Sequence, residues 1–465
     1  MSLRAKKWRS NLLATAKYFM SLFQKITSNL REDNLLRRVL NSSFHLFSSN
    51  TISLALSVLQ SALVFHLLEV GERGVLRIVM SYAATVNTLL SFRLGELIVR
   101  YGGEYLETQE KEKASALMKA ASLTEGFVSL LAFIVVVLTS GWASESIAKT
   151  PGTGWMFIFF AIGLLANFNT ETSLGVLQIT RKIRLQGVIN LVQSLITFSV
   201  IVAAYFLNGS IEVILFAYLL SKAVFGIGMF TAARIQLHRV LGAGWWRQSL
   251  SALTARREIA RFAISTNISA TISKVFRESE ILWVGFFISP VAAGYYDAAL
   301  TIVGFLSLPT DALIVNTYPE VNRLIVIKAW TQLKDFLRKI TSFASLYNLA
   351  LALGLVLFGR LILRVYSGEQ YVDAAYPALL ALLVGLAFNY SLYWNRSLLL
   401  SLGMPEFSIK VTLIVGLIKI ALAFVLVPRF GIVAAAALLS FYYIATVGVQ
   451  VWRGVKKIRQ LEIAA

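Results

Sequence analysis

The sequence contains no cysteine and only three histidines in 465 residues. The absence of cysteine excludes a disulfide framework and a thiolate metal site. The histidines, His45, His66 and His238, are too scattered along the chain to indicate a metal site. A P-loop, a dinucleotide-binding fingerprint and paired carboxylates in an aqueous segment are also missing. We therefore expect no metal, no cofactor and no enzymatic activity.

Charged residues are scarce as well, at 15% of the chain, whereas 57% of the residues are hydrophobic and the mean hydropathy is +0.70. This composition excludes a soluble domain of such length and predicts a polytopic membrane protein. A net charge of +20 would suggest nucleic acid as a partner of a soluble chain. Here the lysines and arginines cluster in particular loops, so they indicate membrane orientation, and we expect no nucleic-acid partner.

Long apolar runs recur along the chain, and their lengths predict an all-α protein with about twelve transmembrane helices in two sets of six. The sets form an N-terminal lobe at 42–237 and a C-terminal lobe at 262–452, joined by a basic linker at 238–261. Residues 1–41 are basic and suit either a helix lying on an anionic leaflet or a disordered tail. Residues 453–465 form a basic tail. The predicted spans are 44–68, 75–99, 121–140, 155–177, 188–207, 211–232, 262–288, 294–315, 343–361, 378–402, 409–427 and 432–451.

Basic residues alternate between successive loops. The segments 111–119, 181–184, 239–261 and 328–339 and both ends of the chain are basic, whereas 143–154 carries only Lys149 and 208–210 and 289–293 carry no basic residue. Because short cytoplasmic loops carry the excess of lysine and arginine, this pattern predicts that both termini lie in the cytoplasm. We expect a multi-pass protein of the cytoplasmic membrane.

A faint internal repeat relates the two sets of spans. Residues 95–100 read GELIVR late in the second span, and residues 311–316 read DALIVN late in the eighth. Since each set contains an even number of spans, the two sets share one orientation, which predicts repeats related by a pseudo-twofold axis along the membrane normal. A transport site would then lie between the lobes.

The seventh span contains a charged turn with Lys274, Arg277, Glu278 and Glu280 between apolar flanks. A lone charge at the centre of a membrane helix costs about 2.5–3.5 kcal/mol, so such groups normally face a protein interior or a wet cavity. Lys274 with Glu278 and Arg277 with Glu280 have the spacing of pairs on one helix surface. The alternative is that the membrane part begins only at Ile281 and that the charged turn lies in water.

Four motifs carry a family resemblance. They are residues 280–299, EILWVGFFISPVAAGYYDAA; residues 318–324, YPEVNRL; residues 94–101, LGELIVRY; and residues 175–186, GVLQITRKIRLQ. The first two resemble the start of the C-terminal lobe of polysaccharide exporters, and the other two resemble the ends of the second and fourth helices. The chain therefore resembles the oligosaccharide flippases (Wzx type) of the multidrug/oligosaccharidyl-lipid/polysaccharide (MOP) superfamily.

The resemblance implies two six-helix bundles in a V, with the first, second, seventh and eighth helices lining a central cavity. A polyprenyl-diphosphate-linked oligosaccharide would cross there by alternating access, with membrane lipids around the protein. Polysaccharide polymerase and glycosyltransferases would be further partners. The diphosphate and the sugars need a polar and preferably cationic path, and arginine binds phosphate oxygens especially well.

The resemblance and the charges together give a set of candidate site residues. Cations on the implied cavity helices are candidates for binding the diphosphate: Arg77, Arg93, Lys274 and Arg277. The two arginines of the second span are alternatively close enough to span ends to reach the membrane surface. The acidic candidates, as counter-ions or as carriers of a coupling proton, are Glu278, Glu280 and Asp311. Cations ranked lower, on helices implied to serve mainly packing, are Lys222, Arg396 and Lys419.

Two other classes of protein are alternatives to a flippase. A cation-coupled multidrug exporter of the same superfamily would typically carry an acidic residue in its first span, and residues 44–68 contain none. The absence of an acidic residue there weakens the case for a multidrug exporter but does not exclude one. A polysaccharide polymerase or ligase would be expected to have a large outer loop, and every predicted outer loop is short.

Overall fold

The computed structural model describes residues 52–91, 94–253 and 256–463, and within these ranges the chain consists of helices and connecting turns without a β-strand. The predicted segment 1–41 and the beginning of the first predicted span lie outside the described residues. The remainder of that span is an apolar helix, Ile52–Leu67.

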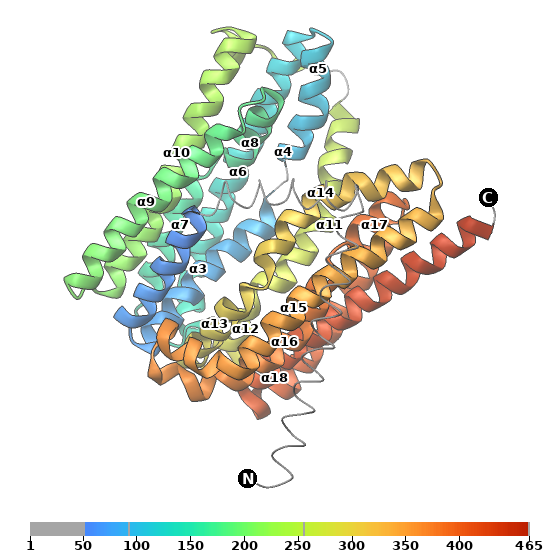
Figure 1. The fold of residues 1–465 in the computed structure, drawn as a ribbon. Coiled ribbons are helices and arrows are strands. Elements are labelled where there is room, and N and C mark those ends of the chain that lie inside the picture. Colours follow the sequence, from blue (N-terminus) through green and yellow to red (C-terminus); the bar gives the residue numbers. More distant parts are fainter. Residues whose placement is uncertain (1–51, 92–93, 254–255, 464–465) are drawn as a thin grey trace.

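The N-terminal lobe forms one arm of the molecule, coloured blue to green in Figure 1. After the helix Ile52–Leu67 it contains α3 (Val70–Leu90), α4 (Leu94–Leu97), η1 (Ile98–Gly102), α5 (Gly103–Glu107), α6 (Lys111–Trp142), η2 (Ala143–Ile147), α7 (Gly154–Ala166), α8 (Thr170–Ile179), α9 (Arg184–Phe206) and α10 (Ile211–Leu241). Two short 3₁₀ turns follow in the linker, η3 (Trp245–Arg247) and η4 (Leu250–Ala252).

The C-terminal lobe forms the other arm, coloured yellow to red. It contains α11 (Arg256–Glu278), α12 (Glu280–Phe287), α13 (Pro290–Gly304), α14 (Ser307–Val326), α15 (Trp330–Ser367), η5 (Glu369–Tyr371), α16 (Val372–Ser391), α17 (Asn395–Ser401) and α18 (Pro405–Ile463). The last of these makes two passages, because Gly431 adopts a φ of 65° and bends the chain. Only glycine takes this conformation without steric cost.

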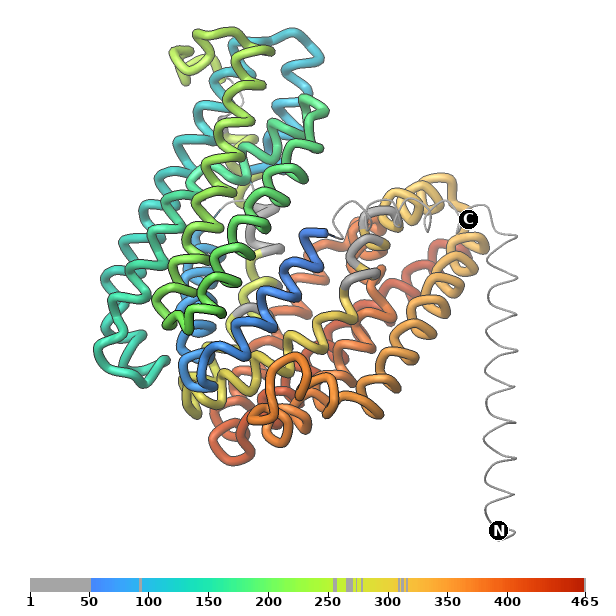
Figure 2. The backbone as a smooth tube through the Cα atoms, turned by 60° about the vertical axis from the view of Figure 1, so that its left-hand side comes forward, coloured from blue at the N-terminus to red at the C-terminus, as the bar shows by residue number. Residues whose placement is uncertain are grey.

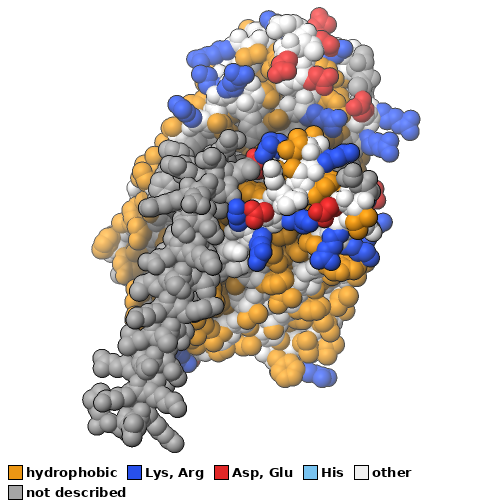
Figure 3. Space-filling model, turned by 45° about the vertical axis from the view of Figure 1, so that its right-hand side comes forward, with side chains coloured by type: hydrophobic (Ala, Val, Ile, Leu, Met, Phe, Trp, Pro, Cys, Tyr) orange, Lys and Arg blue, Asp and Glu red, His pale blue; other side chains and the backbone are white. Residues whose placement is uncertain are grey.

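The helices have the lengths and the surface of a membrane protein. In the described ranges, eight helices or helix series are long and apolar enough to cross a bilayer. Lysine, arginine and acidic side chains gather at the tips of the two arms, whereas the lower half of the face in Figure 3 is mostly hydrophobic. A broad apolar belt between charged ends is the surface expected in a bilayer.

Several predicted spans are not continuous helices. Among them, the spans predicted at 155–177, 262–288, 294–315 and 378–402 are broken at residues 167–169, 279, 305–306 and 392–394. At the first break, the buried Glu125 accepts hydrogen bonds from the backbone N–H groups of Glu171 and Thr172, at 2.8 and 2.9 Å. A carboxylate at this place satisfies the unpaired donors that begin α8. Glu125 is thus part of the lobe's own architecture.

The two arms meet at one end and diverge at the other, as the tube in Figure 2 shows. One large hydrophobic cluster joins residues of both lobes at the meeting end, among them Phe65 and Tyr296. Two smaller clusters lie apart from it, one in each arm, around Leu117 and around Leu398. The apolar core is therefore shared at the closed end and divided at the open end, which gives the predicted V.

Glycines allow the lobes to touch at the closed end. A Cβ atom at Gly74 of α3 would lie 1.8 Å from the carbonyl oxygen of Pro290, and one at Gly294 of α13 would lie 2.3 Å from that of Val70. Both distances are far inside van der Waals contact, so only glycine permits this approach of the two backbones. The closest contact between the lobes is thus built by α3 and α13.

The helix α11 runs from one arm into the other. Ile259 in its first turn is buried in the cluster of the N-terminal arm, and Arg100 lies 4.7 Å from the ring centre of Phe262. Phe276, near its C-terminal end, is buried in the shared cluster and packs against Tyr442 of α18. The first turns of α11 therefore pack with the N-terminal lobe and its last turns pack with the C-terminal lobe.

Candidate functional site

A cavity of about 1050 Å³ lies between the arms. Most of its lining comes from α14, α16, α17 and α18 of the C-terminal lobe, and Glu96 and Gln178 contribute from the N-terminal lobe. The helices α16 to α18 were expected to serve mainly packing. The expectation that the first, second, seventh and eighth helices supply the lining is therefore too narrow.

The lining of this cavity is polar and rich in tyrosine. Its hydrogen-bonding side chains are mainly hydroxyls and amides, and Arg396 and Glu96 supply one charge of each sign. Amides and hydroxyls donate and accept hydrogen bonds, and tyrosine adds a flat apolar face with a polar tip. Such a surface suits a neutral polyhydroxylated molecule, and one arginine adds affinity for an anionic group. The tyrosines and amides are Tyr318, Tyr390, Tyr393, Tyr442, Tyr443, Gln178, Asn389, Asn395 and Gln450.

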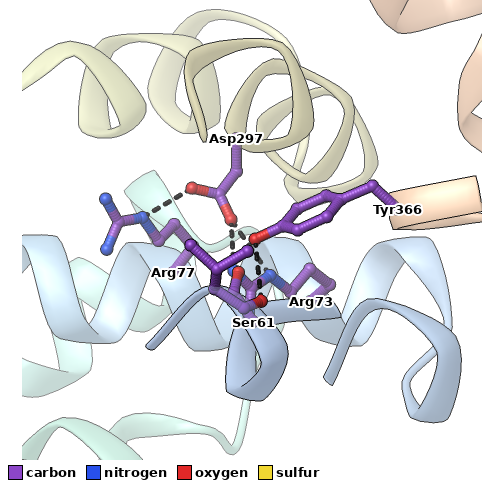
Figure 4. Close-up of polar contacts among 6 residues, drawn as sticks. Ser61, Arg73, Arg77, Asp297 and Tyr366 are labelled. Atoms are coloured by element: carbon purple, nitrogen blue, oxygen red, sulfur yellow. Dashed lines mark hydrogen bonds and ion pairs between the residues drawn. The ribbon is translucent and has the colours of Figure 1, made fainter. Parts of the chain in front are cut away.

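An ion-pair cluster joins the lobes at the closed end, shown in Figure 4. Asp297 of α13 lies between Arg73 and Arg77 of α3 and is 1% exposed. Nη2 of Arg73 lies 2.8 Å from Oδ2 of Asp297, and Nε of Arg73 donates to the same oxygen at 3.0 Å. Nε of Arg77 lies 2.7 Å from Oδ1 without hydrogen-bond geometry, so this contact is electrostatic. One carboxylate thus neutralises part of the charge of two guanidinium groups.

The two arginines differ in their surroundings. The side chain of Arg73 is 7% exposed, stacks 4.1 Å above the ring centre of Phe65 and donates to Oγ of Ser61 at 3.4 Å. The side chain of Arg77 is 39% exposed. A buried cation depends on its partner far more than an exposed one. The pairing of Arg73 with Asp297 therefore dominates the energetics of the cluster.

Further polar contacts cross the same end. A ring nitrogen of His66 lies 3.0 Å from the carbonyl oxygen of Val365. The hydroxyl of Tyr366 donates to the carbonyl oxygen of Val58 at 3.3 Å. Nζ of Lys149 donates to the carbonyl oxygen of Ile288 at 3.0 Å. Each of these bonds connects the N-terminal lobe with the C-terminal lobe, so several polar contacts hold the lobes together at this end.

A second buried ion pair lies inside the C-terminal lobe. Lys419 of α18 binds Glu280, and its Nζ also donates to the carbonyl oxygen of Phe276 at 3.1 Å. The hydroxyl of Tyr296 donates to the other carboxylate oxygen of Glu280 at 3.2 Å. The side chains of Lys419 and Glu280 are 4% and 3% exposed. Glu280, the first residue of α12, is thus held inside the bundle by Lys419 and Tyr296.

Removing one member of this pair should destabilise the protein more than removing both. Glu280→Gln or Lys419→Met leaves a buried charge unpaired, which typically costs about 3–5 kcal/mol. The double variant removes both charges and should recover most of that loss, as thermal unfolding in detergent will measure. If the double variant regains stability but not activity, the pair has a functional role as well. If both return, the pair is structural. Single variants as stable as the wild type would contradict the buried pairing.

The predicted site residues fall in separate places. Arg77 lies at the closed end, Arg396 in the cavity lining, Lys419 beside Glu280, and Lys274 on an exposed face of α11. Lys222 lies within the N-terminal lobe, where its Nζ is 5.5 Å from the ring centre of Phe160. Arg93 lies outside the described residues, as do the side chains of Arg277, Glu278 and Asp311. The binding and coupling roles of all these residues stay predictions.

Two residues of the closed end were not singled out from the sequence. Arg73 lies just before a predicted span, where a cation has an ordinary surface explanation. Asp297 lies within the eighth predicted span, and an acidic residue in an apolar run is itself a signal of a buried partner. That signal was present in the sequence, but the identity of the partner was not.

Comparison with known proteins gives the family. A family model described as polysaccharide biosynthesis protein matches residues 39–319. The inner membrane protein YghQ of Escherichia coli (strain K12) is 22% identical over 353 residues, covering 74% of this chain and 96% of that protein.

Two solved structures share the fold. The lipid II flippase MurJ in an inward closed conformation matches with a TM-score of 0.64 and 14% identity over 90% of each chain. A multidrug resistance MATE family transporter in an inward-facing conformation matches with a TM-score of 0.63 and 15% identity, covering 93% of this chain and 97% of that chain. The predicted fold of two helical bundles is confirmed. Since the family model covers more than half of its length, the chain belongs to the polysaccharide biosynthesis protein family.

Proposed function

We propose that the protein is a flippase that moves polyprenyl-diphosphate-linked oligosaccharides across the cytoplasmic membrane for surface polysaccharide assembly. The observation that carries this proposal is the polar, tyrosine-lined cavity of about 1050 Å³ between the arms. Its hydroxyls and amides suit a glycan, and Arg396 suits the diphosphate. The polyprenyl tail would remain in the lipid beside the arms. The family membership of the chain supports the same class of cargo.

The proposal includes an orientation. The basic loops between α5 and α6, α8 and α9, and α14 and α15 lie at the diverging end of the arms. The excess of lysine and arginine favours the cytoplasm for that end and for both termini. The described state is then open to the cytoplasm and closed to the outside by the Arg73–Asp297 contact. Transport requires the opposite state, in which this contact is broken.

Deletion of the gene tests the class of cargo. Loss of a glycan flippase should stop surface polysaccharide and leave lipid-linked units accessible only from the cytoplasmic face, with drug tolerance unchanged. The structural match to a multidrug transporter keeps a cation-coupled drug exporter as the second candidate. Normal surface polysaccharide together with raised sensitivity to cationic dyes would overturn the flippase proposal in favour of that exporter.

Arg396→Ala should lower transport about 10- to 100-fold while the protein still accumulates in the membrane, because a charged hydrogen bond contributes about 1.5–3 kcal/mol. Arg396→Lys should recover little, since an ammonium group cannot form the planar two-point contact of a guanidinium group. The control is Arg360→Ala at the closed end, where Nη1 lies 2.9 Å from Asp373 in a surface pair. This variant should transport normally. Normal transport by Arg396→Ala would exclude Arg396 from cargo binding.

A further inference from the structure

A second cavity, of about 570 Å³, lies in the N-terminal arm and shares no lining residue with the central one. It is formed by α6, the break between α7 and α8, the end of α10 and the linker turn η3. We refer to it as the linker pocket. The lining side chains on which the argument depends are Leu123, Phe127, Arg234, His238, Trp246 and Arg247.

One part of the linker pocket is basic. Arg234, His238 and Arg247 contribute to the lining, and no acidic residue is among the lining side chains. All three basic side chains are exposed, so their charged ends are available to a ligand. Two arginines without an acidic neighbour in the lining favour an anion, and a phosphate group matches the geometry of guanidinium.

The other part of the pocket is apolar and faces outward. Phe127 is 67% exposed, Leu123 47% and Trp246 45%, and Phe168 packs against Phe230 with ring centres 5.0 Å apart. A free phosphate ion would leave this wall uncovered. A lipid with an anionic headgroup satisfies both parts, because its phosphate meets the arginines while its acyl chains cover the aromatic side chains.

The position of the pocket fits the same ligand. It lies near the basic end of the bundle, where α10 ends, and the proposed orientation places this end at the cytoplasmic leaflet. That leaflet carries the anionic lipids and attracts basic segments. The linker turn is held against α6, because Nζ of Lys119 donates to the carbonyl oxygen of Gln248 at 3.2 Å and Trp245 is buried. A ligand in this pocket therefore touches both the arm and the linker between the lobes.

We propose that the linker pocket binds an anionic phospholipid of the surrounding membrane, with Arg234 and Arg247 receiving the headgroup phosphate and Phe127 and Leu123 contacting the acyl chains. Such a site goes beyond transport of the cargo, and its occupancy is measurable whether or not the protein is a flippase. It provides a means by which membrane composition acts on the linker.

Native mass spectrometry of the purified full chain tests the site with phosphatidylglycerol, phosphatidylcholine and inorganic phosphate as probes. The wild type should retain phosphatidylglycerol in preference to phosphatidylcholine. Arg234→Gln with Arg247→Gln should weaken phosphatidylglycerol binding about thirtyfold, since each cation near an anionic surface contributes about a factor of five to six. Inorganic phosphate at the same concentration should not displace the lipid.

The matched control is Arg338→Gln with Arg459→Gln, which removes two exposed cations from the C-terminal lobe, at α15 and near the end of α18. This variant should bind phosphatidylglycerol like the wild type. If the pocket variant does not purify as a single species, Arg247→Gln alone replaces it and should still weaken binding. Unchanged binding by the pocket variant, equal binding of phosphatidylcholine, or displacement by inorganic phosphate would each overturn the proposal.

Discussion

Oxidation of a Gly71→Cys, Val291→Cys variant should stop transport, and reduction should restore it. Gly71 belongs to α3 and Val291 to α13, and a Cβ atom at Gly71 would lie 3.5 Å from Cγ2 of Val291. The Sγ atom of a cysteine occupies about the place of a valine Cγ atom, so this contact brings the two side chains within reach of a disulfide, whose Cβ atoms lie about 3.5–4.5 Å apart. The pair is therefore placed to cross-link the lobes at their closed end. Because the chain has no native cysteine, no other thiol competes. The cross-link holds the protein in one state, and a carrier that alternates between two states then stops.

A pair within one lobe provides the control. A Cβ atom at Gly103 of α5 would lie 3.7 Å from Cγ2 of Ile179 of α8, and both helices belong to the N-terminal arm. Oxidised Gly103→Cys, Ile179→Cys protein should transport normally, because this cross-link restrains no movement between the lobes. The extent of cross-linking is measured by gel mobility. Transport that continues when the Gly71–Val291 pair is fully cross-linked would show that the closed end need not open.

Asp297→Ala should reduce transport about a hundredfold or more. The variant leaves the buried guanidinium of Arg73 without its carboxylate, and stranding a buried charge typically costs about 3–5 kcal/mol. That free energy corresponds to a decrease of about a hundredfold or more in the population of the state in which the lobes are in contact. Introduced together with the two cysteines, Asp297→Ala should also lower the yield of the Gly71–Val291 cross-link. The experiment thus reports on the closed end directly as well as on transport.

Two further variants separate the buried charge from general damage. Asp297→Glu keeps a carboxylate and should retain part of the cross-linking and transport. Asp373→Ala removes a carboxylate that is 90% exposed in a surface pair with Arg360, and it should have little effect. Wild-type cross-linking and transport by Asp297→Ala would show that the cluster does not hold the lobes together.

The number and placement of the helices were predictable because the bilayer fixes the length of an apolar span. The breaks in the helices were not predicted, and the break before α8 depends on a group from elsewhere in the chain. Residues 155–177 were predicted as one span despite the polar Asn167 and Asn169, yet the structure ends α7 at Ala166 and starts α8 at Thr170. The carboxylate of Glu125, 46 positions earlier, supplies the hydrogen bonds that begin α8. Hydrophobicity contains no record of such a long-range contact.

Long-range contacts also limited the prediction of which charged residues pair with one another. Spacing along a helix suggested that Glu280 pairs with Arg277, three positions away. The structure pairs Glu280 with Lys419, 139 positions away, and it pairs Arg73 with Asp297 over 224 positions. Charges in a membrane need partners, and that requirement was visible in the sequence. Which charges meet is decided by how the helices pack.

The course of α11 has a mechanical consequence. Because Ile259 is fixed in one arm and Phe276 in the shared core, a change in the angle between the arms has to be taken up as bending of the helix between these residues. The first residue of α12 is Glu280, so the bent segment ends beside the Lys419 ion pair. We therefore expect a change in the angle between the arms to load α11 as a leaf spring and to act on the ion pair at its C-terminal end.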